Sequence, residues 1–244
     1  EARSTLNATN RNGETALMLA ACFGHTACVD LLLQAKATVY AKSVTGETAL
    51  SWAVEGDHVE CARLLIDANA DLEVTNKNEN TILMQAANKG HRACMKLLLD
   101  AKAKTDSRKT NGRTALFNAV SHNHTVCAQM LLHAKAEVNL TDENGKSALI
   151  LAVEKGYTEC TQVLIDAKAD VETKNKNGIT ALMVGASKGL VACVQLLVEA
   201  KAKIDIKSEK GNTALTIAKA KGLHEVVDIF RKAKADRAST TDPH

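Results

Sequence analysis

The sequence has few aromatic residues, a single proline and no long apolar run. Phenylalanine, tyrosine and tryptophan make up 2% of the 244 residues, whereas 45% of the residues are apolar. The core must therefore consist of small and aliphatic side chains, which favours closely packed helices. No run of 18 apolar residues and no signal-like N-terminus is present, so we expect no direct insertion into a membrane.

Motifs that carry chemistry are also missing. There is no glycine loop for phosphate, no nucleophile elbow and no zinc-ligand spacing. Carboxylates such as Glu143, Glu154 and Asp166 fall on solvated loops and helices, with nothing to shift their pKa values as a catalytic acid requires. We therefore expect no enzymatic activity, no cofactor and no small-molecule substrate. The net charge of +3 names no partner, and nucleic acid is disfavoured because no aromatic residues interleave the basic ones to stack bases.

A 33-residue period runs through the chain. The motif Gly-x-Thr-Ala-Leu and its variants begin at residues 13, 46, 79, 112, 145, 178 and 211, and Ala-Lys-Ala begins at residues 35, 101, 134, 167, 200 and 233. Ala68-Asn69-Ala70 occupies the missing place in the second series. A fixed period of this length predicts a repeat architecture. In the third repeat Glu79 and Ile82 replace glycine and alanine, which predicts a turn that bends differently. A local contact and sequence drift explain the two replacements equally well.

Each repeat reads as a turn, a short helix, a second turn and a second helix. Glycine and asparagine clusters supply the first turn, and the Thr or Ser that follows can cap a helix, from about Thr48 to Glu55 in the second repeat. That helix is expected to end at a residue that tolerates a left-handed conformation: Gly24, Asp57, Gly90, Asn123, Gly156, Gly189 and Gly222. The second helix carries a buried stripe such as Cys61, Leu64 and Leu65, and repeats must stack to cover it.

These residues resemble the ankyrin repeats over nearly the whole chain. Gly13 to His25 and Ala169-Asp170-Val171 match the family pattern, although alanine or Ile82 replaces its proline and other residues replace the histidine of T-P-L-H. The resemblance implies an all-α ankyrin-repeat solenoid of helix-turn-helix units with β-hairpin-like turn fingers. The expected repeats are 10–42, 43–75, 76–108, 109–141, 142–174 and 175–207, followed by a C-terminal capping repeat at 208–235.

The two ends depart from the regular repeat. Residues 1–9 align with the end of a preceding repeat, and residues 236–244 are polar and expected to be disordered. The lysines of the Ala-Lys-Ala series fall where the family places a helix-ending glycine, so we expect each to adopt a left-handed conformation or to avoid it by a local adjustment. They form a ladder along one edge, with Asn69 as its gap, and an edge that faces an anion is the alternative to a purely structural role. The members of the ladder are Lys36, Lys102, Lys135, Lys168, Lys201 and Lys234.

Six of the seven cysteines share one position of successive repeats: Cys28, Cys61, Cys94, Cys127, Cys160 and Cys193. Stacked helices lie about 8–10 Å apart, whereas a disulfide needs Cα atoms about 4.4–6.8 Å apart. We expect free, buried thiols and a reducing intracellular compartment, either cytoplasm or an organelle interior, for a chain that is not secreted. Cys22 breaks the pattern and is expected on the concave side. A metal site at His122, His124, Cys127 and His133 is disfavoured, because His124 and Cys127 fall in positions that the repeat uses for packing.

The resemblance implies that partners bind across the turn tips and the concave face of the first helices. The corresponding candidates are Arg11, Glu14, Phe23, Glu47, Lys77, Lys89, Arg113, His122, Lys146, Lys155, Lys176, Ile179, Lys188, Lys210 and Lys221. Basic residues outnumber acidic ones from the third repeat onward, which predicts a partner protein with an acidic segment. A lysine-rich face that serves solubility is the alternative.

The leading interpretation is a non-catalytic scaffold that binds another protein or braces a subunit within a larger assembly. A second interpretation is the ankyrin segment of a longer enzyme, channel or acyltransferase, for which the start of the chain within a repeat argues. A designed repeat protein is disfavoured by irregular residues such as Trp52, Asn69 and Glu79.

Overall fold

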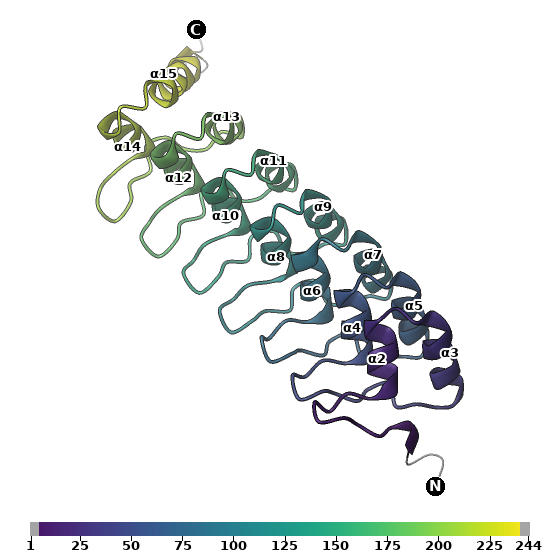
Figure 1. Ribbon diagram of the computed structural model, residues 1–244. Coiled ribbons are helices and arrows are strands. Elements are labelled where there is room, and N and C mark those ends of the chain that lie inside the picture. Colours follow the sequence, from purple (N-terminus) through teal and green to yellow (C-terminus); the bar gives the residue numbers. More distant parts are fainter. Residues whose placement is uncertain (1–4, 240–244) are drawn as a thin grey trace. The chain divides into compact units, whose positions relative to one another are not determined.

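The computed structural model of the protein describes residues 5–239, which form helices in pairs (Figure 1). The chain divides into two compact units, Glu1–Ala136 and Glu137–His244. The described part of the first unit contains α2 Ala16–Cys22, α3 Thr26–Gln34, α4 Ala49–Glu55, α5 Val59–Asp67, α6 Ile82–Lys89, α7 Arg92–Asp100, α8 Ala115–Ser121 and α9 Thr125–His133. The second contains α10 Ala148–Lys155, α11 Thr158–Asp166, α12 Ala181–Lys188, α13 Val191–Glu199, α14 Ala214–Ala220 and α15 His224–Ser239.

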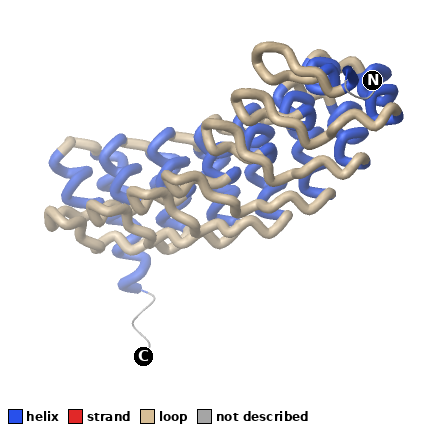
Figure 2. The backbone as a smooth tube through the Cα atoms, turned by 90° about the horizontal axis from the view of Figure 1, so that it is seen from below, coloured by secondary structure: helices blue, strands red, loops and turns tan. Residues whose placement is uncertain are grey.

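Within each unit the helices form two rows. In the first unit α2, α4, α6 and α8 lie side by side, and α3, α5, α7 and α9 form the row behind them (Figure 1). The second unit repeats this arrangement, with α10, α12 and α14 in one row and α11, α13 and α15 in the other. Long loops separate the pairs, and Figure 2 draws no strand in the part of the chain that it describes. The all-α fold class expected from the sequence is confirmed.

Threonine or serine caps most of the first helices, as predicted. The hydroxyls of Thr15, Thr48, Thr81, Ser147, Thr180 and Thr213 accept hydrogen bonds of 3.2–3.4 Å from the backbone N–H three residues later. Each such bond satisfies one of the amides that a helix start leaves without an internal partner. Thr114 has the same extended backbone but makes no side-chain cap bond.

The turn between the paired helices also follows the prediction. Gly24, Asp57, Gly90, Asn123, Gly156, Gly189 and Gly222 all adopt the left-handed conformation, with φ between 55° and 74°. The chain reverses at these residues and begins the second helix a few residues later. Asp and Asn reach this conformation more easily than other non-glycine residues, which explains Asp57 and Asn123.

The lysine ladder ends the second helices as expected. Lys36, Asn69, Lys102, Lys135, Lys168 and Lys201 have φ between 59° and 69°. The N–H of Lys135 donates to Leu132 O (3.0 Å), and the N–H of Ala136 donates to Leu131 O (3.0 Å). These two bonds are the Schellman arrangement, which satisfies the last carbonyl groups of a helix. The left-handed conformation costs a lysine about 1–2 kcal/mol. The favourable interaction of its positive charge with the helix C-terminus offsets part of this cost.

Two expectations about the C-terminal region are wrong. Helix α15 continues to Ser239, so Lys234 does not end a helix, and its Nζ instead pairs with Asp205 Oδ1 at 2.7 Å. The disordered tail expected from residue 236 is helical up to residue 239, and residues 240–244 lie outside the described part. The reason is composition, because residues 231–238 are mainly alanine, lysine and arginine, which favour helix, and include no glycine to end it.

The cysteine positions follow the stacking of the repeats. Cys61, Cys94, Cys127, Cys160 and Cys193 are buried, and Sγ of Cys61 lies 3.5 Å from the hydroxyl of Thr26 in the preceding repeat. Cys28 was expected to be buried but is exposed, and Leu31 beside it is 65% exposed. Their position faces the preceding repeat, and among the described residues no helix precedes α3 in its row.

None of the described helices combines the length and the apolar composition needed to cross a membrane.

Candidate protein-binding face

Most of the fingers, meaning the loops that precede each first helix, are held by a side-chain oxygen at the start of the turn. In the first unit Oδ1 of Asn10 accepts from the backbone N–H groups of Asn12 and Glu14, and Asn76 does the same for its own turn. Ser43, Asp142 and Asn175 play this part in other fingers. Such short polar side chains stabilise turns by standing in for backbone acceptors. The tips of these fingers therefore have a defined shape before any partner binds.

Neighbouring fingers are joined by backbone hydrogen bonds within each unit. The N–H of Val44 donates to Asn12 O (2.8 Å), and that of Lys77 donates to Thr45 O (3.0 Å). In the second unit the N–H of Lys176 donates to Asn144 O (2.9 Å). The tips thus stand in register beside the row of first helices. We call this surface of each unit, the finger tips together with the exposed side of the first helices, the finger face.

The finger at Glu79 does not bend differently, contrary to the expectation. Glu79 has φ 59° and its N–H donates to Asn76 O at 2.9 Å, the same bond that Gly13 makes to Asn10 at 2.9 Å. Its carboxylate accepts from the hydroxyl of Thr110 (2.5 Å) and the N–H of Thr110 (2.6 Å) in the next finger. These hydrogen bonds lower the pKa of the Glu79 carboxyl group. Sequence drift alone therefore does not explain glutamate at this position, because its side chain makes specific hydrogen bonds with Thr110.

Most of the candidate residues are exposed on the finger face of their own unit. The exposed members are Arg11, Phe23, Lys77, Lys89, Arg113, His122, Lys155, Lys176, Lys188, Lys210 and Lys221, and the half-buried ones are Glu14, Glu47, Lys146 and Ile179. Phe23 is 65% exposed, which is unusual for so large an apolar ring.

Several of the candidate lysines are engaged within the protein. Lys188 Nζ donates to Glu154 O (2.8 Å) and Lys221 Nζ donates to Ser187 O (2.7 Å), so each amine binds a carbonyl of the preceding first helix. Lys89 pairs with Glu55 at 2.6 Å, and Lys146 pairs with Glu154. Their charges are thus partly used inside the chain.

Three candidate lysines of the second unit are different. Within the described residues, the amines of Lys155, Lys176 and Lys210 make no hydrogen bond or ion pair, and all three side chains are exposed. Among the candidate lysines of the second unit, these three carry positive charge that remains available to a partner.

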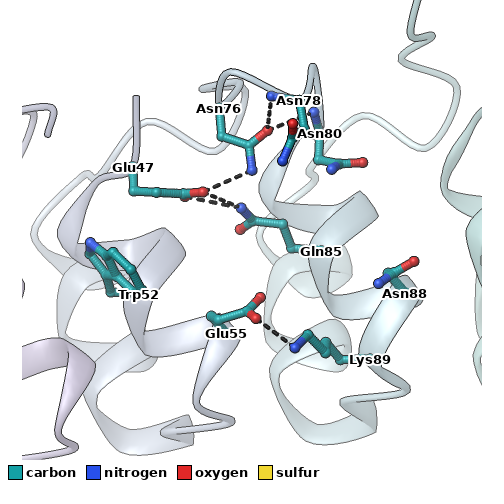
Figure 3. Close-up of a pocket in the computed structure, with 9 residues that line it drawn as sticks. All are labelled: Glu47, Trp52, Glu55, Asn76, Asn78, Asn80, Gln85, Asn88 and Lys89. Carbon is teal, nitrogen blue, oxygen red and sulfur yellow. Dashed lines mark hydrogen bonds and ion pairs between the residues drawn. The ribbon is translucent and has the colours of Figure 1, made fainter. Parts of the chain in front are cut away.

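A polar hollow of about 290 Å³ lies between α4, α6 and the finger before α6 in the first unit (Figure 3). Glu47 forms part of its wall, and its carboxylate accepts from Asn76 Nδ2 (2.8 Å) and from Gln85 Nε2 (3.1 and 3.0 Å). Gln85 is only 7% exposed, and its Oε1 has no hydrogen-bond partner. Trp52 borders the same space (Figure 3).

Sequence reasoning selected Glu47 and Lys89 but missed the hollow itself. One signal was available in the repeat alignment. Trp52 and Gln85 occupy a position that is Leu19, Leu151, Val184 or Ile217 in other repeats. A polar side chain at a position that is otherwise mostly apolar marks a local departure from the scaffold.

The side chains of His122, His124, Cys127 and His133 do not form a common metal site in the structure. Nε2 of His124 lies 3.1 Å from Asn88 O, Cys127 is buried, and the rings of His122 and His124 stack with centroids 6.1 Å apart. Among the residues described, no group of three or more His, Cys, Asp or Glu side chains is placed to hold a metal ion.

Burial raises the pKa values of several thiols. Desolvation, with a smaller contribution from Asp57, raises the pKa of Cys94 to about 12. Desolvation also raises the pKa of Cys127. The pKa of Cys22 is raised by partial burial and then by the charge of Glu14.

Comparisons with known proteins agree with this geometry. A family model described as "Ankyrin repeats (3 copies)" matches residues 2–76, 68–142, 132–208 and 149–241. No curated protein sequence matches the chain. The crystal structure of the ankyrin repeat domain of Bcl-3, described as a unique member of the IkappaB protein family, is 27% identical with a TM-score of 0.83, over 91% of this chain and 100% of that one. The human ASB11 ankyrin repeat domain is 23% identical with a TM-score of 0.74, over 84% of this chain and 92% of that one, and shows the same fold. The family match spans every described residue, so the chain belongs to the ankyrin-repeat family.

Proposed function

We propose that this chain is a non-catalytic protein-binding scaffold that recognises its partner through the finger face. Ankyrin repeats are general modules for binding other proteins, and the chain belongs to that family. The observation that carries the proposal is the contrast within each repeat. The helices are buried against their neighbours, whereas the tips keep charged side chains exposed on turns that are already fixed by hydrogen bonds. Fixed turns reduce the entropy that binding must overcome.

The charge of the second unit supports a partner with an acidic segment there. Lys155, Lys176 and Lys210 are exposed, and their amines have no partner within the described residues. A carboxylate that pairs with such an amine gains little per contact, about 0.2–1 kcal/mol, so several must act together. Such contacts mainly set specificity and association rate. We further propose an intracellular, reducing compartment, which the free cysteines support.

A peptide-display selection tests the proposal. The immobilised chain is used to select from a random-peptide library, and we expect enrichment of sequences rich in aspartate and glutamate. The double variant Lys176→Glu with Lys210→Glu should lose these peptides, because it reverses charge at two finger tips.

The matched control is Lys168→Glu with Lys201→Glu. These lysines are also exposed, and the change in net charge is the same, but they end the second helices α11 and α13. The control should retain the selected peptides. Equal binding by the two double variants, with both folded by circular dichroism, would refute the acidic partner, and failure to enrich any peptide would count against the finger face itself.

A further inference from the structure

We propose that the hollow bordered by Glu47, Trp52, Glu55 and Gln85 in the first unit binds an arginine side chain of the partner protein. The proposal rests on the proposed function, since it names one residue type that the finger face would recognise. It concerns the first unit alone. The partner would present an arginine to this unit, in addition to the acidic segment proposed for the second unit.

Gln85 supplies the first argument, because its orientation is determined by its neighbour. A carboxylate can only accept hydrogen bonds, and Gln85 Nε2 lies 3.1 and 3.0 Å from the two oxygens of Glu47. The amide oxygen must therefore point away from Glu47. Figure 3 shows it directed toward the space between Trp52 and Glu55. This Oε1 is buried without a hydrogen-bond partner, on a side chain that is 7% exposed, so a donor that enters the hollow reaches it only by displacing the side chains that cover it.

The charge of the lining supplies the second argument. Two acids, Glu47 and Glu55, and one base, Lys89, line the hollow, which leaves a net charge of −1. Lys89 pairs with Glu55 at 2.6 Å. Glu47 receives hydrogen bonds from the neutral amides of Asn76 and Gln85 only, within the part of the chain described. A cation therefore fits this hollow better than a neutral or acidic side chain.

Trp52 supplies the third argument and favours arginine over lysine. The indole is half-buried and borders the hollow (Figure 3). A guanidinium group is planar and carries five N–H donors, so it can lie against an aromatic ring and still donate to acceptors on its edges. Gln85 Oε1 and the Glu55 carboxylate are acceptors on two sides of the space. The ammonium group of lysine is more strongly hydrated and lacks the flat surface.

Comparison between repeats argues against a purely structural role for Gln85. In the next repeat Asn118 occupies the equivalent position, and its Nδ2 donates to Met84 O at 3.1 Å. In other repeats leucine, valine or isoleucine suffices, as at Leu19 and Leu151. The scaffold therefore does not require glutamine here, and only this repeat leaves a buried side-chain acceptor without a partner among the described residues.

Nuclear magnetic resonance of the single tryptophan tests the proposal. Because the chain has one tryptophan, its indole N–H signal reports on this hollow without ambiguity. The probe is an acetylated and amidated pentapeptide with arginine at its centre and glycine elsewhere. We expect it to shift the indole signal with half-saturation on the order of millimolar, as suits one side chain. Pentapeptides with citrulline, which is neutral, or lysine at the centre should bind about tenfold more weakly.

Two variants and a control separate binding from structural effects. Glu55→Gln and Gln85→Leu should each weaken the response to the arginine peptide by about tenfold. Glu143→Gln, the same change at an exposed acid on a finger of the second unit, should leave it unchanged. A single sharp indole signal in the free variants and a thermal unfolding midpoint no lower than that of the parent protein show that the fold is intact.

Three results would overturn the proposal. These are an arginine peptide that leaves the indole signal unmoved up to roughly 50 mM, a citrulline peptide that binds as well as arginine, or a response that survives both variants. Because the probe carries no acid and the readout is at Trp52, failure here leaves the lysine test of the proposed function standing. Conversely, the outcome of the peptide-display selection for acidic peptides does not change the result expected from the indole titration.

Discussion

Alkylation of the native protein should separate its cysteines by several orders of magnitude in rate. Cys28 is exposed on α3, whereas Cys94 is fully buried on α7. A thiol reacts as the thiolate, so both access and pKa govern its rate. Burial first, and then the neighbouring Asp57 carboxylate, raises the pKa of Cys94 from 9.0 to about 12. Iodoacetamide should therefore modify Cys28 long before Cys94.

The size of the difference follows from two routes to the buried thiol. At pH 8 a thiol with pKa 9.0 is about one-tenth thiolate, and one with pKa about 12 is about one ten-thousandth thiolate, so reaction in the closed state is slowed about 1000-fold. If the reagent must wait for α7 to open, an opening free energy of about 4 kcal/mol gives the same factor. Reaction in the closed state therefore predicts a rate for Cys94 about 1000-fold below that of an exposed thiol, and opening dominates only if it costs less than about 4 kcal/mol.

The sign of the pH dependence is also determined. The pKa of Cys94 is higher in the folded than in the unfolded chain, so folding favours the neutral thiol. The stability that this contributes is fully present below about pH 9 and is lost as the pH rises toward 12. Alkylation of Cys94 in the closed state should accelerate over the same interval.

Mass spectrometry of quenched peptides measures each site separately. Asp57→Asn keeps a residue that tolerates φ 55° and removes the negative charge, so it should increase the alkylation rate of Cys94. Glu14→Gln should increase the alkylation rate of Cys22, because the charge of Glu14 is the second-largest cause, after burial, of its raised pKa. Cys28→Ser should remove the fastest reaction, and in guanidinium the cysteines should react alike. Modification of Cys94 within a factor of about ten of Cys28 in the folded protein at pH 8 would refute the reasoning.

Three further predictions concern stability. Thr48→Ala should lower the free energy of unfolding in urea by about 1 kcal/mol, because it removes a helix cap, whereas Thr114→Ala should cost less, since the Thr114 hydroxyl makes no cap bond; equal losses would contradict the assignment. Leu98→Ala should cost about 2–5 kcal/mol because Leu98 is fully buried, and Leu31→Ala, at a 65% exposed residue, should cost much less by the same measurement. The pKa of Glu79 is lowered, so its contribution is present above the unfolded value near 4.5 and is lost as the pH falls through the folded value. The melting temperature of Glu79→Gln should therefore change less between pH 7 and pH 3 than that of the parent protein, and an identical change would disprove the role of its hydrogen bonds to Thr110.

Local rules made the repeat predictable, and they failed where a residue depends on its neighbours. Capping by Thr48 and the left-handed conformations of Asp57 and Lys135 follow from each residue's own place in the period. Cys28 has the same place as Cys61, but its burial depends on a helix that no described residue supplies before α3. Lys234 has the same place as Lys201, yet the helix formers around it carry α15 onward.

The candidate site was predictable in outline but not in its contacts. The period places Lys176 and Lys210 at finger tips, and both are exposed. It does not reveal that Lys188 donates to a carbonyl of the preceding helix, because that contact spans 34 residues and depends on the reach of a flexible side chain. Nor does it reveal Gln85 beside Glu47, a contact between residues 38 apart. Those contacts need the stacking geometry of the repeats.

Departures from the repeat can be sorted by whether the chain compensates for them. Glu79 replaces a turn glycine, but its carboxylate binds both donors of Thr110 in the next finger. Lys109 stands where other fingers have an acceptor side chain, and its Nζ donates to Asn80 Oδ1 at 3.3 Å. Both residues are satisfied within the chain, so stability alone accounts for them.

Gln85 fails the same criterion. Its nitrogen is satisfied by Glu47, but its buried oxygen has no partner in the described part of the chain, a condition that costs about 1–3 kcal/mol. Leucine, which fills the same position at Leu19 and Leu151, would avoid that cost without losing the apolar packing of the helix row. Gln85 therefore makes the fold less stable than leucine would, and it borders a negatively charged hollow. A hydrogen-bond donor from a partner protein explains best why glutamine is present there.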